Sequence, residues 1–477
     1  MSRVAEIVDA MRAGQSSPGA MAREVAARLA LAETRALNAV LAWSSDALDR
    51  EAARIDGQGH GALTGVPVAI KDNIVTTEQP TTCGSKILEG YVSPFNATAV
   101  VRLRGAGAMI AAKTNLDEFA MGSSTEHSAF GRVHHPLDPA RVPGGSSGGS
   151  AAVVAAHLVP AALGSETGGS VRQPASFCGV VGVKPTYGRV SRYGLVAFGS
   201  SLDCISVFGE TTDDAARVLS VISGHDPLDA TTVDRPPTEL PDGPASLDGM
   251  TIGLPQEYFP DDLDPGVRAA TDRAVSVLRE LGAKVKPVSL PHSRYAVPTY
   301  YVIAPAEAAS NLARYDGARY GQRVVGEGGG LRDLYRATRG AGFGPEVRRR
   351  ILIGTYVLSA GYYDAYYTKA QQVRVRIAQD FGQVFGQGVD YLFTPTTPTP
   401  AFAAGERTED PVSMYLADIF TAAISLAGLP AMSLPIGRID GLPIGGQLIA
   451  PAFDETGMLA VGMALEQAID PTAEALS

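Results

Sequence analysis

Two segments of the sequence combine glycine with serine in a pattern that suits a reactive hydroxyl group. They are residues 144–150 (GGSSGGS) and residues 164–170 (GSETGGS). Glycine permits backbone conformations with positive φ, and it lets N–H groups approach a ligand closely, often just before a helix begins. The two segments therefore predict loops that present a serine to a substrate and surround the reacting atoms with N–H donors.

Several kinds of site compete to explain these segments. A phosphate-binding loop would need a lysine after its last glycine, but Ser150 follows Gly149. A Ser-His-Asp hydrolase fits the G-x-S-x-G letters of residues 144–148, but it also needs a downstream histidine. His225 lies in a predicted surface connection and His292 lies beside a proline, so neither position suits a buried base. Flexible turns without chemistry would explain one such segment more readily than two.

The remaining kind of site is a serine activated by a lysine, which needs no histidine. Val66, Val68 and Ile70 alternate with other residues, which predicts a strand that delivers Lys71 at its end. A free lysine has a pKa near ~10.4 and is protonated at neutral pH. Burial lowers the pKa by several units and would make Lys71 a proton acceptor, whereas a lysine on the surface would stay charged.

Longer stretches around these motifs resemble the amidase signature family. They are residues 66–73 (VPVAIKDN), 143–152 (PGGSSGGSAA) and 164–194 (GSETGGSVRQPASFCGVVGVKPTYGRVSRYG). Three more stretches resemble one branch of that family, the glutamine-hydrolysing A subunits of tRNA-dependent amidotransferases: residues 113–131 (KTNLDEFAMGSSTEHSAFG), 304–317 (APAEAASNLARYDG) and 361–371 (GYYDAYYTKAQ). The resemblance runs in order along most of the chain.

The resemblance implies a Ser-cisSer-Lys triad. Ser170 matches the nucleophile of the family, and Lys71 matches the general base. Ser146 matches the serine that bridges them, whose peptide bond with Gly145 is cis in the family. An oxyanion hole is expected from the backbone N–H groups of Thr167, Gly168, Gly169 and Ser170.

Glutamine carries an α-carboxylate and an α-ammonium group, so its pocket should hold one cation and one anion. By resemblance these are Arg350 and Asp418, and a planar guanidinium suits a carboxylate. Arg349 is an alternative to Arg350, because adjacent residues of a helix face different directions. Gly122 and Ser123 are expected to line the same pocket. Solvated surface charges are the alternative interpretation of the charged pair.

The function implied by the resemblance is glutamine hydrolysis within a heterotrimer that also contains the B and C subunits of the amidotransferase. Ammonia would pass to a partner that converts Glu-tRNA(Gln), Asp-tRNA(Asn) or both. This chain would need no cofactor, whereas the complex would use ATP and Mg²⁺ and would bind aminoacyl-tRNA mainly through the B subunit. A free-standing amidase is the alternative within this class, and a silent scaffold is the alternative outside it. The intact triad argues against the scaffold, and the charged pair favours an amino-acid amide.

Two features depart from the family pattern. Glu166 stands where the family usually has aspartate, which is one methylene shorter. Residues 201–208 read SLDCISVF, where SLDQIGPF is expected. These departures put the local packing near the pocket in doubt, but they leave the triad intact.

Strand and helix patterns alternate around the motifs. Helices are expected at residues 20–33, 45–54, 99–104, 150–157, 267–281 and 456–469, and strands at 66–70, 109–112, 159–163, 251–254, 284–290, 389–394 and 446–449. This interleaving predicts an α/β fold with a large, mixed, mostly parallel central sheet covered on both faces by helices. We expect one amidase-signature domain over residues 1–477, with N-terminal helices at 1–60, a catalytic core at 61–222 and the second half of the sheet at 249–477. A surface connection at 223–248 would join the two halves.

Composition limits the partners of this chain. Its 40 Lys and Arg residues against 50 Asp and Glu residues give a net charge of −10, whereas direct binding of nucleic acid usually needs a basic excess. The cysteines and neighbouring histidines show no metal-ligand spacing, so we expect no metal site and reduced, buried thiols. These residues are Cys83, Cys178, Cys204, His127, His134 and His135. No segment is long and apolar enough to span a bilayer, and we expect a cytoplasmic protein without membrane contacts.

Overall fold

The computed structural model describes residues 2–57, 59–326, 328–408 and 410–474. Within these ranges eleven strands form one sheet in the order β1-β3-β2-β4-β6-β5-β10-β11-β9-β7-β8. The strands are β1 (Val40–Ala42), β2 (Pro67–Lys71), β3 (Met109–Thr114), β4 (Ala161–Glu166), β5 (Val181–Lys184), β6 (Cys204–Gly209), β7 (Thr251–Pro255), β8 (Lys284–Val288), β9 (Tyr391–Pro395), β10 (Ala431–Ile439) and β11 (Leu442–Ile449). The sheet contains strands from both halves of the sequence, which meet where β5 pairs with β10.

The direction of the strands corrects one part of the sequence-based prediction. The sheet is mixed, as expected, but it is not mostly parallel, because six of its ten pairings are antiparallel. The parallel pairings join β3, β2 and β4 at one flank and β9, β7 and β8 at the other. The middle strands β6, β5, β10 and β11 run antiparallel to their neighbours. Of these four, β5, β6 and β10 were missed by the sequence pattern, which predicted interleaved strands and helices but no strand at these positions.

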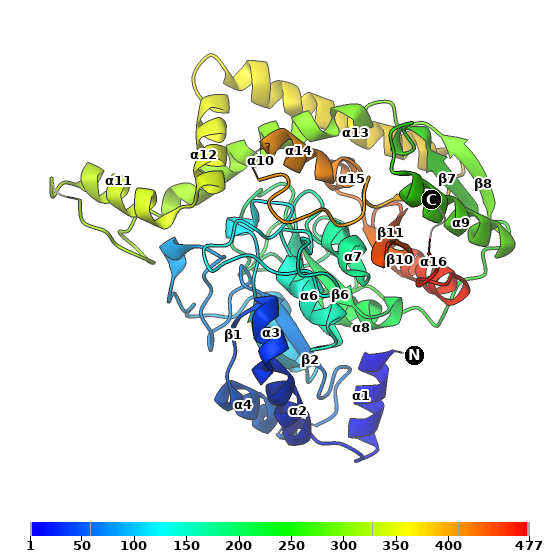
Figure 1. Cartoon of the computed structure of the whole chain (residues 1–477), viewed down its shortest axis with the longest axis horizontal. Coiled ribbons are helices and arrows are strands. Elements are labelled where there is room, and N and C mark those ends of the chain that lie inside the picture. The colour runs from blue at the N-terminus through cyan, green and yellow to red at the C-terminus, as the bar shows by residue number, and fades with distance from the viewer. Residues whose placement is uncertain (1, 58, 327, 409, 475–477) are drawn as a thin grey trace.

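Helices cover both faces of the sheet, as predicted (Figure 1). The helices α5, α8, α16 and α9 contact one another in that order on one face. On the other face α6 contacts mainly β4 and β2, and α7 contacts β5, β10 and β11. The helices α10, α12, α13 and α15 pack together outside this second layer. The bounds are α1 (Arg3–Arg12), α2 (Pro18–Ala30), α3 (Ala32–Leu37), α4 (Ser45–Asp56), α5 (Thr98–Gly105), α6 (Gly148–Ala155), α7 (Arg172–Cys178), α8 (Thr212–Ile222), α9 (Pro265–Glu280), α10 (Ala296–Asn311), α11 (Leu331–Gly342), α12 (Pro345–Val357), α13 (Lys369–Gly386), α14 (Pro411–Tyr415), α15 (Ala422–Ala427) and α16 (Glu455–Ala468).

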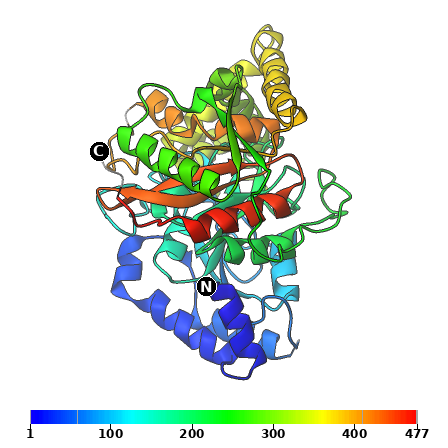
Figure 2. The ribbon, with the colours of Figure 1, turned by 90° about the vertical axis from the view of Figure 1, so that its right-hand side faces the viewer.

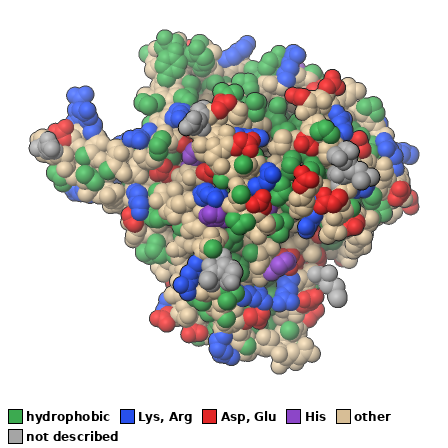
Figure 3. All heavy atoms as spheres, viewed as in Figure 1, with side chains coloured by type: hydrophobic (Ala, Val, Ile, Leu, Met, Phe, Trp, Pro, Cys, Tyr) green, Lys and Arg blue, Asp and Glu red, His purple; other side chains and the backbone are tan. Residues whose placement is uncertain are grey.

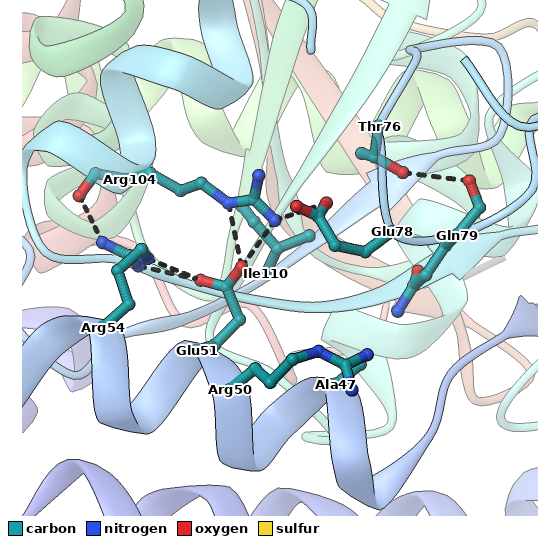
Figure 4. Close-up of a pocket in the computed structure, with 9 residues that line it drawn as sticks. All are labelled: Ala47, Arg50, Glu51, Arg54, Thr76, Glu78, Gln79, Arg104 and Ile110. Carbon is teal, nitrogen blue, oxygen red and sulfur yellow. Dashed lines mark hydrogen bonds and ion pairs between the residues drawn. The ribbon is translucent and has the colours of Figure 1, made fainter. Parts of the chain in front are cut away.

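Ion pairs join helix α4 to α5 and to the segment that follows β2. Glu51 on α4 accepts from Arg54 at 2.8 Å and pairs with Arg104 on α5 at 2.6 Å. Arg104 also pairs with Glu78 at 2.7 Å, and the group lines a small cavity of about 150 Å³ (Figure 4). Because each carboxylate in this cavity has an arginine partner, we interpret the cavity as part of a structural contact that holds these segments together. Figure 2 shows that the N-terminal helices lie at the opposite end of the molecule from α12 and α13.

Cys83, Cys178 and Cys204 are buried and form no disulfide, as expected. In the described ranges, no helix is both long enough and apolar enough to cross a membrane.

Candidate active site

Lys71 ends strand β2, and its side chain is fully buried. The Nζ atom donates to the Ser146 hydroxyl at 2.8 Å, to the Ser147 hydroxyl at 2.7 Å and to the Ser165 carbonyl oxygen at 3.2 Å. The strand predicted from the alternating apolar residues therefore delivers the lysine directly to the first glycine-serine segment. The sequence-based interpretation had not included Ser147 among the contacts of Lys71.

Burial lowers the pKa of Lys71 from 10.5 to about 7, and the negative charge of Asp117 opposes this shift without cancelling it. In the part of the chain that the structure describes, the amine has only hydroxyl and carbonyl partners. The neighbouring Lys113 is also buried, but it forms an ion pair with Asp72 at 2.8 Å. Lys71 is therefore the buried lysine of this region that can lose its proton near neutral pH and accept one from a hydroxyl.

The first glycine-serine segment is partly loop and partly helix. Gly144 has a φ of +81°, the peptide bond between Gly145 and Ser146 is cis, as the resemblance implied, and α6 begins at Gly148. A Cβ atom on Gly145 would overlap the Asp117 carboxylate, so only glycine fits there. Ser146 is fully buried beneath this tight loop, with its hydroxyl in contact with Lys71.

The second segment differs from the predicted loop, because residues 164–166 belong to strand β4 and the loop starts at Thr167. Ser170 lies in that loop, retains 7% of its surface and accepts a hydrogen bond from the Ser147 N–H at its carbonyl oxygen, at 3.1 Å. Within the described residues, the backbone N–H groups at positions 167–170 have no hydrogen-bond acceptor. Four consecutive N–H donors without an internal partner make a suitable environment for an anion.

Residues from distant parts of the chain pack against the loop that carries Ser170. A Cβ atom on Gly168 would overlap the ring of Tyr300. A Cβ atom on Gly169 would overlap the Thr421 hydroxyl, and it would lie 2.9 Å from a carboxylate oxygen of Asp418. Asp418 is therefore adjacent to the loop that carries Ser170. The Thr167 hydroxyl donates to Asp203 at 2.7 Å, which ties the start of the loop to the segment before β6.

Arg350 and Arg349 have different environments, which distinguishes the two alternatives. Arg350 is 2% exposed, and its guanidinium lies 5.2 Å from the centre of the Tyr301 ring and 5.4 Å from that of Tyr415. Its Nε donates to Glu346 at 2.8 Å. The side chain of Arg349 is 45% exposed. Because only Arg350 is buried among aromatic rings on the inner side of α12, the structure favours it as the pocket cation.

Asp418 ends the short 3₁₀ helix η7 (Leu416–Asp418), and it is 6% exposed. Its Oδ2 accepts from the Ser123 hydroxyl at 2.6 Å, and its Oδ1 is buried without a hydrogen-bond partner among the described residues. Burial raises the pKa of Asp418 to about 7, against the opposing effect of the Ser123 hydrogen bond. An unpartnered buried carboxylate oxygen needs a donor, and the ammonium group of an amino acid would supply one.

Gln173 on α7 is a site residue that the sequence analysis missed. Its Oε1 accepts from the Gly145 N–H at 2.8 Å, and its Nε2 donates to the Ser123 carbonyl oxygen at 2.7 Å. The fully buried side chain thus connects the cis loop to the pocket loop, where a Cβ on Gly122 would overlap Asp117. The only signal in the sequence was its place three residues after Ser170, which gave no indication of its partners.

The departure at Glu166 leaves the nucleophile loop well anchored. The fully buried Glu166 forms an ion pair with Arg172, and it accepts from the backbone N–H groups of Val171 at 3.0 Å and Arg172 at 3.1 Å. Although burial raises the pKa of Glu166, the charge of Arg172 outweighs it and keeps the pKa below its usual range. The longer acid therefore stays ionised and holds the chain just after Ser170.

In the described ranges, no group of three His, Cys, Asp or Glu side chains is placed to hold a metal ion. His127, His134 and His135 lie outside helices and strands, as predicted, and His135 is hydrogen-bonded to the Phe177 carbonyl oxygen at 2.8 Å.

A sequence profile of the family described as Amidase matches residues 21–459 of this chain. The chain belongs to the amidase family. Among curated relatives, the A subunit of Glutamyl-tRNA(Gln) amidotransferase from Carboxydothermus hydrogenoformans is 58% identical over 424 residues, which covers 88% of this amidase and 86% of the relative. The protein of the same name from Symbiobacterium thermophilum is 53% identical over 462 residues and covers 95% and 94% of the two chains.

Solved structures of other amidases share the fold. The crystal structure of the A subunit of Glutamyl-tRNA(Gln) amidotransferase from Thermotoga maritima has a TM-score of 0.80 and 44% identity, with 96% of this amidase and 95% of that chain covered. The structure of 6-aminohexanoate cyclic dimer hydrolase in complex with its substrate has a TM-score of 0.83 and 27% identity, with 98% and 97% covered. This chain is therefore an enzyme of the amidase and amidotransferase type.

Proposed function

We propose that this chain hydrolyses glutamine and supplies the ammonia to a tRNA-dependent amidotransferase, in which it is the glutaminase component. One observation carries the chemical part of the proposal. A fully buried lysine with a pKa of about 7 donates to Ser146, and the N–H of the next residue, Ser147, donates to the Ser170 carbonyl oxygen at 3.1 Å. The relatives named as amidotransferase A subunits support this function over that of a free-standing amidase.

The proposed reaction begins with neutral Lys71. The amine takes a proton from the Ser146 hydroxyl, which takes the proton of Ser170, so that the Ser170 oxygen attacks the side-chain amide carbon of glutamine. The N–H groups at positions 167–170 stabilise the resulting oxyanion. The tetrahedral intermediate expels ammonia, to which the proton returns through Ser146. Water then cleaves the glutamyl ester by the same proton path and releases glutamate.

The charged residues of the pocket explain a preference for glutamine. In our proposal Arg350 binds the α-carboxylate, and Asp418 binds the α-ammonium through its unpartnered Oδ1. Ser123 holds the other oxygen of Asp418, and Gly122 lets its own backbone pass close to Asp117. A simple apolar amide would leave the buried Asp418 unpaired, which disfavours its binding.

The rest of the proposed reaction belongs to partner proteins. We assign ATP and Mg²⁺ to the assembled heterotrimer with the B and C subunits, and aminoacyl-tRNA mainly to the B subunit, because this chain carries a net charge of −10. Ammonia has to reach that partner without crossing bulk water, where it would become protonated. The proposed acceptor is Glu-tRNA(Gln), Asp-tRNA(Asn) or both, and the proposed reaction takes place in the cytoplasm.

The test is glutamate release from glutamine by the purified chain and by the reconstituted complex. Ser170→Ala should lower kcat by about 10⁴-fold or more, because the triad acts as a unit. Ser176→Ala is the matched control, since Ser176 is also a buried serine of this region but hydrogen-bonds to the Gly445 N–H on β11. Near-normal turnover of correctly folded Ser170→Ala protein would refute the mechanism. Full activity of the isolated chain, with no stimulation by the B and C subunits, would identify an independent amidase instead.

A further inference from the structure

Helix α12 carries different chemistry on its two sides. Arg350 points inward and is 2% exposed, whereas Leu352 is 71% exposed and Tyr356 is 50% exposed. Arg348, Leu352 and Tyr356 are four residues apart, so they form one stripe along the outer side of the helix. The helix that holds the proposed carboxylate-binding residue therefore also presents an apolar stripe to solvent.

The apolar stripe continues onto the segment that follows α12. The ring centre of Tyr356 lies 4.4 Å from that of Tyr362 and 6.1 Å from that of Tyr366 on η6 (Tyr363–Thr368). Tyr362 and Tyr366 are themselves 41% and 43% exposed. We call Leu352, Tyr356, Tyr362 and Tyr366 together the tyrosine surface. Hydrophobic side chains gather over the α12 end of the molecule in Figure 3.

The charge around the tyrosine surface is opposite to that of the whole chain. Residues 345–386, which span α12, η6 and α13, contain six Lys and Arg residues and three Asp and Glu residues, a net charge of +3, in a chain whose net charge is −10. Arg348 and Lys369 are exposed, and in the sequence they precede and follow the residues of the tyrosine surface. An apolar centre with cations at its margins is complementary to a protein surface with an apolar centre and an acidic rim.

We propose that the tyrosine surface is where an acidic-rimmed partner protein docks, namely the one that receives the ammonia; this rests on the proposed function. A protein fits better than RNA, because the rings pack on one another at 4.4 Å and leave no space for a base between Tyr356 and Tyr362. Tyrosine, like tryptophan and arginine, is enriched among the residues that contribute most to binding at protein interfaces.

A partner bound at this surface would also affect the glutamine pocket, through Arg350. Arg350 lies between Arg348 and Leu352 in sequence, on the same rigid helix. A partner seated on the outer side of α12 therefore fixes the position of Arg350 on the inner side. The expected consequence is a lower KM for glutamine in the complex than in the isolated chain.

The experiment uses the full chain with the B and C subunits of the amidotransferase from the same genome. Leu352→Glu with Tyr356→Glu should weaken the complex at least tenfold and abolish the decrease in KM, while the glutaminase activity of the isolated chain is unchanged. Arg348→Glu and Lys369→Glu should weaken the complex more at low salt than at high salt. The matched control is Leu228→Glu, since Leu228 is 62% exposed but lies in the connection before β7.

The outcomes separate this inference from the proposed function. If the wild-type chain neither binds the B and C subunits nor hydrolyses glutamine, the proposed function fails. If the wild type binds them and the double variant binds equally well, the docking inference is overturned. The protein partner is also overturned if the double variant loses binding only to added tRNA, or if it converts a dimer of this chain to a monomer.

Discussion

Replacement of Lys71 by methionine separates the chemistry of the lysine from the free energy required to bury it. Methionine has a similar length and no charge, so it fills the same space beneath Ser146. Burial lowers the pKa of Lys71 from 10.5 to about 7. Between these two pH values the unfolded chain holds a proton on this amine that the folded chain has released.

The sign of the effect follows from this difference in protons. Stability rises with pH wherever the unfolded state binds more protons, by about 1.4 kcal/mol per pH unit for one group. With a folded pKa of about 7 and an ordinary value of 10.5, the wild type should gain ~3 kcal/mol relative to Lys71→Met between pH 7 and about pH 9.5. The penalty for burying the charge is complete below the folded pKa, and it disappears as the pH rises through the unfolded pKa.

The assay is urea unfolding of wild type and Lys71→Met at several pH values. The hydrogen bonds lost with the amine change the difference in free energy of unfolding between the two proteins by the same amount at every pH. The slope of this difference with pH therefore reports only the proton on Lys71. Lys286→Met, at an exposed position of β8, controls for removal of a lysine as such. In parallel, kcat of the wild type should rise with pH through an apparent pKa near 7, because the neutral amine is the base. A stability difference that does not change with pH would mean that Lys71 stays charged in the folded protein, and the assignment of the base would be wrong.

Two further predictions concern the pocket and its supports. Asp418→Asn should raise the KM for glutamine by about 10- to 100-fold with little change in kcat, because a charge-assisted bond to the ammonium is lost; an unchanged KM would reject the pocket. The wild-type KM should also increase as the pH falls through about 7, since protonated Asp418 cannot pair with the ammonium. Gln173→Met should lower the free energy of unfolding by about 2–4 kcal/mol and also lower kcat, because the Gly145 N–H and the Ser123 carbonyl oxygen lose their buried partner. Urea unfolding and glutamate release measure the two effects, and a stable, fully active variant would show that Gln173 does not position the cis loop.

Local patterns predicted the parts of the fold that depend on neighbouring residues. The alternating residues before Lys71 predicted a strand, and β2 ends at that lysine. The periodic apolar residues at 267–281 predicted a helix, and α9 covers Pro265–Glu280. The hairpin between β10 and β11 had a local signal too, since Asp440 and Gly441 both adopt positive φ, at 52° and 77°. An Asp-Gly pair between apolar runs favours such a two-residue turn, but the sequence analysis did not use it.

Contacts between distant residues could not be predicted in this way. Ser123 and Asp418 are 295 positions apart, and the resemblance placed both in the pocket without giving their mutual hydrogen bond. The choice between Arg349 and Arg350 depended on which side of α12 faces Tyr301 and Tyr415, and the helix period alone does not fix that rotation. Antiparallel pairing in the middle of the sheet likewise joins strands that are far apart in the sequence, such as β4 with β6, β5 with β10 and β9 with β11.

The two departures from the family pattern are neighbours in space, although Glu166 and Cys204 are 38 positions apart in the sequence. The register of β4 and β6 places Glu166 opposite Cys204, where the family pattern has aspartate and glutamine. Directly opposite residues of an antiparallel pair lie side by side on the same face of the sheet, so their volumes are coupled. Glu166 is longer than aspartate by one methylene, and Cys204 is shorter than glutamine, so we interpret the second change as compensation in volume for the first. Because the carboxylate still reaches the N–H groups of Val171 and Arg172, the exchange changes the packing behind the loop and keeps the anchor just after Ser170.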